Sequence, residues 1–372
     1  MARSIFFYTD SAIFGGAEQA LLTLIGAIDR GDWRPTLLMH ESPGMERMLG
    51  LAAELDTPVR LLAPIPLGLA GARRVPVFAA GLRRERPDVF HAHMSWPLAA
   101  KYALAGAVVA RVPAVVATVH HFGRLELDRS TRVQLRALAA GVGRYIAVSR
   151  DIRASLIGRL GVPAGKVEIV RNGVAVERLA SPESPRLRAE LASASQRSVV
   201  LTCARLDPLK GIDVLLRAAK ELPDVAFAIA GEGPERGALE AQASSLDLGD
   251  QVAFLGRRGD VPSLLAACDA VALPSLVEGT SLAVLEAMAA GRAVVSTDIP
   301  GTDELIADGV SGLLVPPSDH VALASALRRV LGDEALRASL ARAGRERVVR
   351  EFSAGRMGGR VAAIYRELLD QR

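Results

Sequence analysis

The sequence predicts an α/β protein with two domains, each built around a mainly parallel sheet. Its 372 residues are enough for two hydrophobic cores of ordinary domain size. Half of the residues are hydrophobic but only 4% are aromatic, which favours helices packed on parallel strands over an all-β sandwich. Short apolar runs recur along the chain, and each is followed by a loop and an amphipathic stretch, as in repeated strand–helix units.

The first domain is predicted to span residues 1–175. Its helices are expected at residues 17–28 and 79–85, and the second of these is basic. Its strands are expected at residues 4–9, 34–39, 88–92, 114–119, 145–148 and 167–170. Because strands alternate with helices, the connections should be crossovers and the sheet should be mainly parallel.

Residues 176–195 interrupt this alternation. They are rich in Ser, Pro and Ala and lack a buried strand pattern, so they are predicted to be the interdomain linker. A second domain is predicted over residues 196–353, with helices at 212–221 and 282–290. Its strands are expected at residues 198–203, 225–230, 252–255, 270–273, 293–296 and 312–315. A last helix is expected near residues 357–369.

The cysteines and the apolar segments indicate the cellular setting. Cys203 and Cys268 both lie in apolar surroundings, which excludes a disulfide framework, and a metal site would need more ligands. The start of the sequence resembles a strand and a Gly loop rather than a signal peptide. The longest apolar stretch, residues 96–119, is interrupted by Lys101 and Arg111 and does not fit a membrane span. We therefore expect a cytoplasmic protein.

Positive charge is concentrated in the first half of the chain. Residues 1–171 contain 22 Lys+Arg against 14 Asp+Glu, or +8, whereas the remainder has 23 against 27, or −4. This asymmetry suggests an anionic acceptor or the inner face of a membrane as a partner, and we expect no nucleic-acid partner. A stripe of three arginines, spaced by three and four residues, is either a solvated helix face or a docking site for anionic lipid. The stripe is Arg129, Arg132 and Arg136, with apolar support nearby from Leu125, Leu127, Val133 and Leu135.

The candidate ligand residues follow expected strands, because open α/β sheets bind ligands at the carboxyl ends of their strands. Residues 273–301 are expected to form strand, loop, helix, strand and loop. Glu278 lies in the first loop, and Glu286 follows eight residues later within the helix. The free N–H groups at the start of this helix suit a diphosphate or a sugar hydroxyl oxygen. The alternative is an ordinary capped helix with a surface glutamate.

Two cations occupy similar positions in the second domain. Arg205 follows the strand at residues 198–203, and Lys210 stands where the next helix begins. Fixed cations there would bind an anionic group such as a phosphate, because Arg can donate to two oxygens at once and Lys supplies a point charge. The alternative is a pair of solvated surface cations.

Glycines and histidines mark further loops after strands. Gly15 and Gly16 occupy the first β–α turn, where glycine lets the backbone approach a ligand. His120 and His121 follow a buried strand, where a neutral imidazole can hydrogen-bond a sugar. His91 and His93 are separated by one residue of a predicted strand, so their side chains should lie on the same face of the sheet. We expect His93 to line the ligand cleft and His91 to be structural.

These segments together resemble the retaining GT-B glycosyltransferases of family 4 (glycosyl transferases group 1). The region of residues 278–286 resembles that family's Glu-x7-Glu signature. The other matching segments are Gly15-Gly16-Ala17-Glu18, His91-Ala92-His93, His120, Tyr145-Ile146-Ala147-Val148-Ser149, Asn172-Gly173-Val174, Arg205, Lys210-Gly211, Gly231-Glu232-Gly233-Pro234 and Phe254-Leu255-Gly256. They occur in the family's order and cover nearly the whole chain, with the weaker resemblance on the acceptor side.

The resemblance implies a GT-B fold, in which two Rossmann-like domains have parallel sheets facing an interdomain cleft. Residues 1–175 would bind the acceptor, residues 196–353 would bind the nucleotide-sugar, and residues 354–372 would pack back on the first domain. Catalytic roles are implied for Glu278, His120, Arg205 and Lys210. Donor contacts are implied for Gly16, Arg205, Lys210, Gly231, Gly233, Leu255, Gly256, Glu278, Gly279, Thr280, Ser281, Leu282 and Glu286. Gly15, Gly16 and His93 would lie on the acceptor side.

The function implied is a retaining, metal-independent transfer of a sugar from a UDP- or GDP-sugar to an acceptor hydroxyl. No cofactor is expected, and the absence of an Asp-x-Asp triplet agrees with independence of metal. A role in cell-surface polysaccharide or glycolipid synthesis, with a sugar, lipid-linked or small-molecule acceptor, follows from the resemblance only. A sugar-nucleotide 2-epimerase and a non-catalytic sugar-nucleotide-binding partner remain as alternatives.

Overall fold

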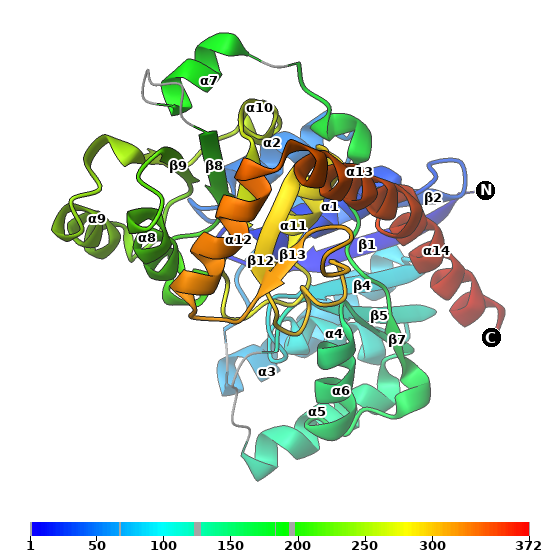
Figure 1. The fold of residues 1–372 in the computed structure, drawn as a ribbon. Helices are drawn as coiled ribbons and strands as arrows, with labels where there is room; N and C mark the ends of the chain where they lie inside the picture. Colours follow the sequence, from blue (N-terminus) through cyan, green and yellow to red (C-terminus); the bar gives the residue numbers. More distant parts are fainter. Residues whose placement is uncertain (1, 67, 123–127, 183, 193–197, 372) are drawn as a thin grey trace. The chain divides into compact units, whose positions relative to one another are not determined.

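The chain forms two compact units. A computed structural model describes residues 2–66, 68–122, 128–182, 184–192 and 198–371. Unit 1 consists of Met1–Gly173 together with Ala354–Arg372, and unit 2 consists of Val174–Ser353 (Figure 1). Unit 1 is therefore made from two segments of the chain that are separated by the whole of unit 2.

Unit 1 contains a seven-stranded sheet in the order β3-β2-β1-β4-β5-β6-β7. Every neighbouring pair is parallel, as predicted. The strands are β1 (Arg3–Thr9), β2 (Trp33–His40), β3 (Val59–Leu62), β4 (Val89–Met94), β5 (Ala114–Val119), β6 (Arg144–Ala147) and β7 (Val167–Ile169). The strand order reverses between β1 and β4, and the loops after these strands lie at the topological switch point, where such sheets bind ligands.

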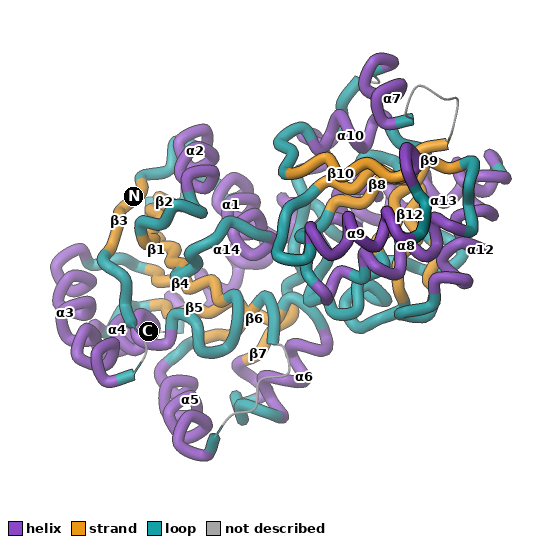
Figure 2. Tube along the Cα trace, turned by 90° about the vertical axis from the view of Figure 1, so that its left-hand side faces the viewer, coloured by secondary structure: helices purple, strands orange, loops and turns teal. Residues whose placement is uncertain are grey.

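Helices cover both faces of this sheet (Figure 2). One face packs against α1 (Gly16–Ala27), α2 (Glu46–Glu54) and α14 (Ala354–Asp370). The other packs against α3 (Leu69–Glu85), α4 (Lys101–Ala110), α5 (Arg129–Gly141) and α6 (Arg150–Gly158). A short 3-10 turn, η1 (Ala164–Lys166), precedes β7. Because both faces are covered, β4 and β5 are buried along their whole length, including His91 and His93 of β4.

Helix α14 joins unit 1 through close backbone packing on α1. A Cβ atom added to Gly358 would lie 2.7 Å from the carbonyl oxygen of Ala27, so only glycine permits this approach. Tyr365, on the same helix, is fully buried and lies edge-on to Trp33, with 5.3 Å between the ring centroids. The end of the chain thus completes the core on one face of the first sheet.

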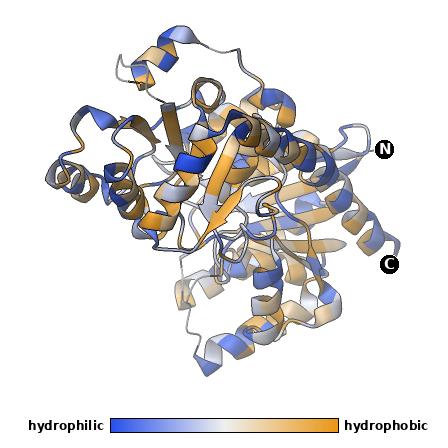
Figure 3. Cartoon of the chain, viewed as in Figure 1, coloured by the Kyte–Doolittle hydropathy of each residue, from blue (hydrophilic) through white to orange (hydrophobic). Residues whose placement is uncertain are grey.

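Unit 2 contains a six-stranded parallel sheet in the order β10-β9-β8-β11-β12-β13. Its strands are β8 (Ser198–Cys203), β9 (Val225–Ala230), β10 (Val252–Gly256), β11 (Ala270–Leu273), β12 (Ala293–Thr297) and β13 (Leu313–Val315). Their apolar character is visible in β12 and β13 (Figure 3). The predicted pair of parallel α/β sheets is confirmed.

The helices of unit 2 also form two layers. One hydrophobic core includes residues of η2 (Val176–Leu179), α7 (Pro185–Leu191), α10 (Val261–Ala267), α11 (Leu282–Ala289) and α13 (Glu334–Glu351). The other includes residues of α8 (Ile212–Lys220), α9 (Arg236–Ser245) and α12 (His320–Gly332). Two short turns, η3 (Pro208–Lys210) and η4 (Gly249–Gln251), precede α8 and β10.

The structure differs from the predicted linker at residues 176–195. The described part of this segment belongs to unit 2 and forms η2 and α7. Val176, Leu179 and Leu191 are buried in the core of unit 2, so the segment packs on this unit instead of spanning between domains. Part of the high Ser and Pro content marks the start of α7, where Ser184 caps the helix and Pro185 begins it.

No described helix combines the length and the apolar character needed to traverse a bilayer.

Candidate functional site

Three loops meet at the carboxyl edge of the unit 2 sheet. The backbone N–H of Leu206, in the loop after β8, donates to the carbonyl of Glu232 in the loop after β9 (3.0 Å). The N–H of Gly231 donates to the carbonyl of Gly256 at the end of β10 (2.8 Å). These hydrogen bonds bring the predicted donor residues Gly231, Gly233, Leu255 and Gly256 into one group of loops.

Glycine is required in this group because the backbones approach each other closely. A Cβ on Gly231 would lie 1.7 Å from the carbonyl oxygen of Ala204, and the φ of Gly231 is +157°. A Cβ on Gly233 would lie 2.1 Å from the carbonyl oxygen of Leu206. Either side chain would displace the loop that follows β8, which also carries Arg205 and Lys210.

An ion pair joins two of the predicted catalytic residues. Lys210 Nζ donates to Glu278 Oε1 at 2.7 Å, and the Ser275 hydroxyl donates to the same oxygen at 2.8 Å. The lysine and glutamate side chains are 23% and 12% exposed, so the pair is largely shielded from solvent. The loop after β8 also touches the end of β11 directly, because a Cβ on Gly211 would lie 2.1 Å from the carbonyl oxygen of Pro274.

Arg205 is far more accessible than Lys210. Its side chain is 59% exposed, and its Nε lies 3.8 Å from Asp207 Oδ2. The other oxygen of Asp207 accepts a hydrogen bond from the N–H of Leu209 (3.0 Å) and so holds the turn that leads into Lys210. The guanidinium of Arg205 is thus weakly tethered and able to reach an anionic ligand, and it shares its loop with Lys210.

The second glutamate lies on α11, as predicted. Helix α11 begins directly after Ser281, and Glu286 is half-buried within it. Burial raises the pKa of the Cys203 thiol at the end of β8, and the nearby Glu286 carboxylate raises it further. This places Glu286 near the end of β8, on the same edge as the other residues predicted to bind the donor. Gly279 and the loop after β12 are in contact, since a Cβ on Gly301 would lie 2.5 Å from the carbonyl oxygen of Gly279.

The first predicted Gly loop lies at the carboxyl edge of unit 1. Gly15 precedes α1, and its N–H donates to the Glu18 carboxylate at 3.0 Å. Glu18 is 4% exposed, and burial raises its pKa. Gly16 is the first residue of α1, so this loop and the helix start are fixed by a carboxylate that belongs to the same turn.

Sequence analysis missed Asp10, which directly follows β1. Its Oδ2 accepts a hydrogen bond from the N–H of Ala100 (2.7 Å), and burial raises its pKa. Its carboxylate also raises the pKa of Glu18, which places the two acidic side chains near each other. The signal was similar to the one used for Glu278, an acidic residue in the loop that follows a buried strand.

Three buried histidines occupy the centre of the unit 1 sheet. His91 Nδ1 lies 2.5 Å from the Tyr365 hydroxyl, and its Nε2 lies 2.7 Å from the Thr118 hydroxyl. His93 Nδ1 lies 3.0 Å from His120 Nε2. Burial lowers the pKa of His91 to about 3, that of His120 to about 4, and that of His93 well below 6.5. All three imidazoles are therefore neutral at pH 7.

The predicted site residues thus form two groups, one at the carboxyl edge of each sheet. Unit 2 contains Arg205, Lys210, Glu278 and Glu286 with the glycine turns, and unit 1 contains Gly15, Gly16, His93 and His120. Within the described ranges, no three His, Cys, Asp or Glu side chains converge in a way that could hold a metal ion. What the arrangement offers chemically is a cationic loop in unit 2 and neutral hydrogen-bonding groups in unit 1.

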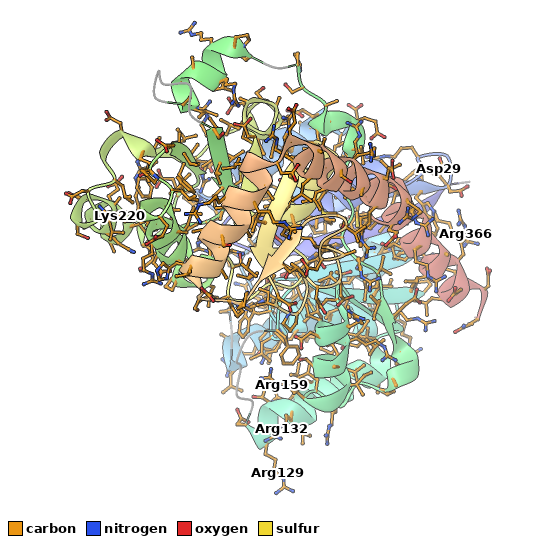
Figure 4. The ribbon with its side chains drawn as sticks, in the orientation of Figure 1. Asp29, Arg129, Arg132, Arg159, Lys220 and Arg366 are labelled. Carbon is orange, nitrogen blue, oxygen red and sulfur yellow. The ribbon has the colours of Figure 1, made fainter. Side chains whose placement is uncertain are left out.

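The arginine stripe lies on the exposed side of α5. Arg129, Arg132 and Arg136 are all exposed, and the first two project away from the helix (Figure 4). Val133 is 59% exposed, but Leu135 is buried in the core of unit 1. The expectation that Leu135 supports a docking surface is therefore wrong, because Leu135 lies on the side of α5 that packs into the core. Leu125 and Leu127 lie outside the described residues.

Comparison with known families and relatives agrees with this architecture. The family model described as Glycosyltransferase Family 4 matches residues 14–178, and the model described as Glycosyl transferases group 1 matches residues 183–347. The chain is 31% identical over 346 residues to the lipopolysaccharide core biosynthesis glycosyltransferase LpsE of Rhizobium meliloti, covering 91% of this chain and 92% of that protein. It is 34% identical over 252 residues to a D-inositol 3-phosphate glycosyltransferase of Salinispora tropica, covering 62% of this chain.

The matches extend over different shares of these relatives. The chain spans about half the length of the Salinispora protein (52%) and of the alpha-D-kanosaminyltransferase of Streptomyces kanamyceticus (46%). Among solved structures, it resembles Anabaena Alr3699/HepE in complex with UDP-glucose, with a TM-score of 0.82, 24% identity, and coverage of 97% and 98%. It also resembles a glycosyltransferase from Rickettsia africae, with a TM-score of 0.86, 18% identity and full coverage of both chains. The chain therefore belongs to glycosyltransferase family 4, the glycosyl transferases group 1, and has the GT-B fold of two Rossmann-like domains.

Proposed function

We propose that the chain transfers a sugar from a nucleoside diphosphate sugar to an acceptor hydroxyl. The observation that carries this proposal is the ion pair of Lys210 and Glu278 beside Arg205 at the carboxyl edge of the unit 2 sheet. Two cations in one loop suit a diphosphate, and the adjacent carboxylate is an acceptor for sugar hydroxyls. The ion pair keeps the lysine ammonium in one position, so little reorganisation is needed when negative charge develops on the leaving phosphate.

In the proposed reaction, the bond between the anomeric carbon and the diphosphate breaks while the acceptor oxygen bonds to that carbon. Arg205 and Lys210 stabilise the nucleoside diphosphate that leaves. Glu278 orients the sugar, and Glu286 accepts a hydrogen bond from the ribose. These contacts accelerate transfer to the extent that they are stronger in the transition state than in the bound donor.

We further propose that the reaction retains the anomeric configuration and uses no metal ion. Retention is the outcome expected of the family that the chain belongs to. Two cationic side chains supply the positive charge that a metal would otherwise bring to the diphosphate, and the sequence contains no Asp-x-Asp triplet. Activity in the presence of EDTA, with product stereochemistry read by NMR, tests both statements.

The acceptor is proposed to be a cell-surface glycan or a glycolipid. The LpsE relative is described as acting in lipopolysaccharide core biosynthesis, and another relative, from Mycolicibacterium smegmatis, as a phosphatidylinositol monomannoside mannosyltransferase. The latter is 32% identical over 285 residues, covering 72% of this chain. The exposed arginines of α5 suit docking on the anionic membrane surface where such acceptors lie.

Ligand screening and substitution test the donor proposal together. Thermal-shift measurements with UDP-, GDP- and ADP-sugars should show one series that raises the melting temperature, because a ligand that binds only the folded state stabilises it. Lys210→Ala and Glu278→Ala should each lower kcat/KM by on the order of 100-fold, the usual loss when one group that stabilises the transition state is removed. Lys220→Ala is the matched control, because Lys220 lies at the end of α8 and donates to a backbone carbonyl (Figure 4). Wild-type rates in both site variants would exclude the mechanism.

Vesicle sedimentation tests the membrane contact. Replacing Arg129, Arg132 and Arg136 by Gln should weaken binding to vesicles that contain anionic lipid, because each basic residue near such a surface contributes about 1 kcal/mol. A control with equal loss of charge replaces Arg329, Arg342 and Arg345, which are exposed in unit 2. Equal binding of both triple variants would show that α5 is not the docking surface.

A further inference from the structure

We propose that His93 holds His120 in a single tautomer, so that the two rings present one hydrogen-bond donor and one acceptor to hydroxyl groups of a bound sugar or acceptor. His93 belongs to β4, and His120 directly follows β5, the neighbouring strand. Both therefore lie at the carboxyl edge of the unit 1 sheet, where open α/β sheets bind ligands. This inference rests on the proposed sugar transfer, because it names the chemical groups that the site would recognise.

The hydrogen bond between the two rings couples their tautomers. His93 Nδ1 and His120 Nε2 are 3.0 Å apart, so one nitrogen carries the proton and the other accepts it. Because burial keeps both rings neutral, each has one N–H group. Two arrangements remain: both rings protonated at Nε2, or both protonated at Nδ1. A mixed arrangement would place two protons, or none, between the rings.

The arrangement with both protons at Nε2 is the favoured one. A neutral histidine side chain intrinsically prefers the Nε2–H tautomer, and this arrangement leaves both rings in the preferred form. His91 does not compete for the pair, since its two ring nitrogens already contact the hydroxyls of Tyr365 and Thr118. In this state His120 Nε2–H donates to His93 Nδ1.

The remaining nitrogen of each ring is then ready for a ligand. Among the described residues, His93 Nε2 and His120 Nδ1 are buried and have no hydrogen-bond partner. The residues are 4% and 8% exposed, and burying a polar atom without a partner costs stability. With the protons placed as above, His93 Nε2–H is a donor and His120 Nδ1 is an acceptor. Sugar and polyol hydroxyls, which both donate and accept, match this pair.

In this proposal His93 both donates to the ligand and positions His120. Two substitutions that each remove the His93 Nε2–H group differ in whether an acceptor for His120 remains, so the comparison between them isolates the positioning role. In His93→Asn, the amide oxygen can replace His93 Nδ1 and still accept from His120 Nε2–H. In His93→Phe, a ring of similar shape remains but the acceptor is lost. His320→Asn, at the start of α12 in unit 2, is the control substitution.

Nitrogen-15 NMR of histidine-labelled protein at pH 7.5 measures the tautomers directly, and only six histidines contribute signals. We expect Nε2–H for both rings in the wild type, the same state for His120 in His93→Asn, and a mixture for His120 in His93→Phe. Nδ1–H in both wild-type rings, or an unchanged His120 in His93→Phe, would overturn the proposal. The wild-type spectrum decides the tautomer even if a substitution prevents folding.

Kinetics test whether the locked tautomer matters for transfer. We expect kcat/KM to fall at least tenfold in His93→Phe and less in His93→Asn, while the Kd for the nucleoside diphosphate, bound in unit 2, stays unchanged in both. Equal kcat/KM for the wild type and His93→Phe would refute the role. A wild-type protein that neither binds the diphosphate nor transfers a sugar would instead refute the proposed function, and the NMR result would still decide whether the pair is locked.

Discussion

Lowering the pH from 7.5 to 5.0 should destabilise unit 1 through its buried histidines. The folded-state pKa values of His91 and His120 are about 3 and 4, below the ordinary value of 6.5 that applies to the unfolded chain. The unfolded state therefore binds protons first as the pH falls. The stability contributed by the neutral rings is fully present above pH 6.5 and is lost progressively towards the folded-state values.

The size of the effect follows from these values. A pH of 5.0 is 1.5 units below the unfolded-state pKa of 6.5 and still above the folded-state pKa values of both histidines. At about 1.36 kcal/mol per unit, each lowers the free energy of unfolding by about 2 kcal/mol, and the two together by about 4 kcal/mol. His93 acts in the same direction. A loss of this size is a large fraction of the stability of an ordinary domain.

Urea unfolding followed by tryptophan fluorescence measures this loss in unit 1 alone. Both tryptophans of the chain, Trp33 and Trp96, belong to that unit. The comparison variant is His91→Gln, which removes one titrating ring. It should be less stable than the wild type at pH 7.5 but should lose about 2 kcal/mol less between pH 7.5 and 5.0.

Two buried carboxyl groups act in the opposite direction. Burial raises the pKa values of Asp10 and Glu18, so the folded state binds protons more readily there and gains stability as the pH falls. Their contribution is the same in the wild type and in His91→Gln, so the difference between the two proteins isolates His91. Identical losses of stability in both would show that His91 does not contribute as argued.

Three further results are expected. Gly231→Ala should weaken binding of the nucleoside diphosphate at least tenfold by calorimetry, because the new Cβ would displace the loop that carries Arg205 and Lys210. Gly237→Ala is the control and should leave the affinity unchanged, because there is open space around Gly237. Equal affinities of the two variants would contradict the argument. Tyr365→Phe should lower the free energy of urea unfolding of unit 1 by about 1–3 kcal/mol, since it leaves His91 Nδ1 without its hydroxyl partner. An unchanged value would show that this contact does not stabilise the unit. Burial raises the pKa values of both cysteine thiols, so a disulfide reagent at pH 7.5 should label them quickly only after unfolding, and rapid labelling of the folded protein would argue against this.

The strands that sequence analysis located best are those with uninterrupted apolar runs. The predicted bounds of β5, β8, β9 and β11 agree with the structure, because these strands are buried on both faces and are therefore mostly apolar. Strand β3 was missed because it is a four-residue edge strand whose short apolar run is interrupted by Arg60, and both Arg60 and Leu61 are exposed. The first half of α3 was missed because it contains Pro76 and several exposed residues.

The sequence predicted which candidate residues follow strands, but it did not predict their contacts. The rule that ligand residues follow strands predicted Arg205, Lys210 and Glu278 as candidates, and the structure places them in the loops after β8 and β11. The rule did not show that Lys210 and Glu278 form an ion pair across 68 residues, because that contact depends on which strands are neighbours in the sheet. The contact between His91 and Tyr365 spans 274 residues and required the return of the last helix.

The return of α14 to the first sheet has a consequence for how the protein is made. During synthesis, all of unit 2 emerges from the ribosome before residues 354–371, which cover the Trp33 side of the first sheet. Unit 2 holds its whole core in one continuous segment and can fold as soon as it is released, whereas the nascent unit 1 must keep an apolar face open until residues 354–371 have also been made. Unit 1 is therefore the first to be started and the last to finish folding. Until α14 is made, it is the part of the nascent protein most in need of a chaperone.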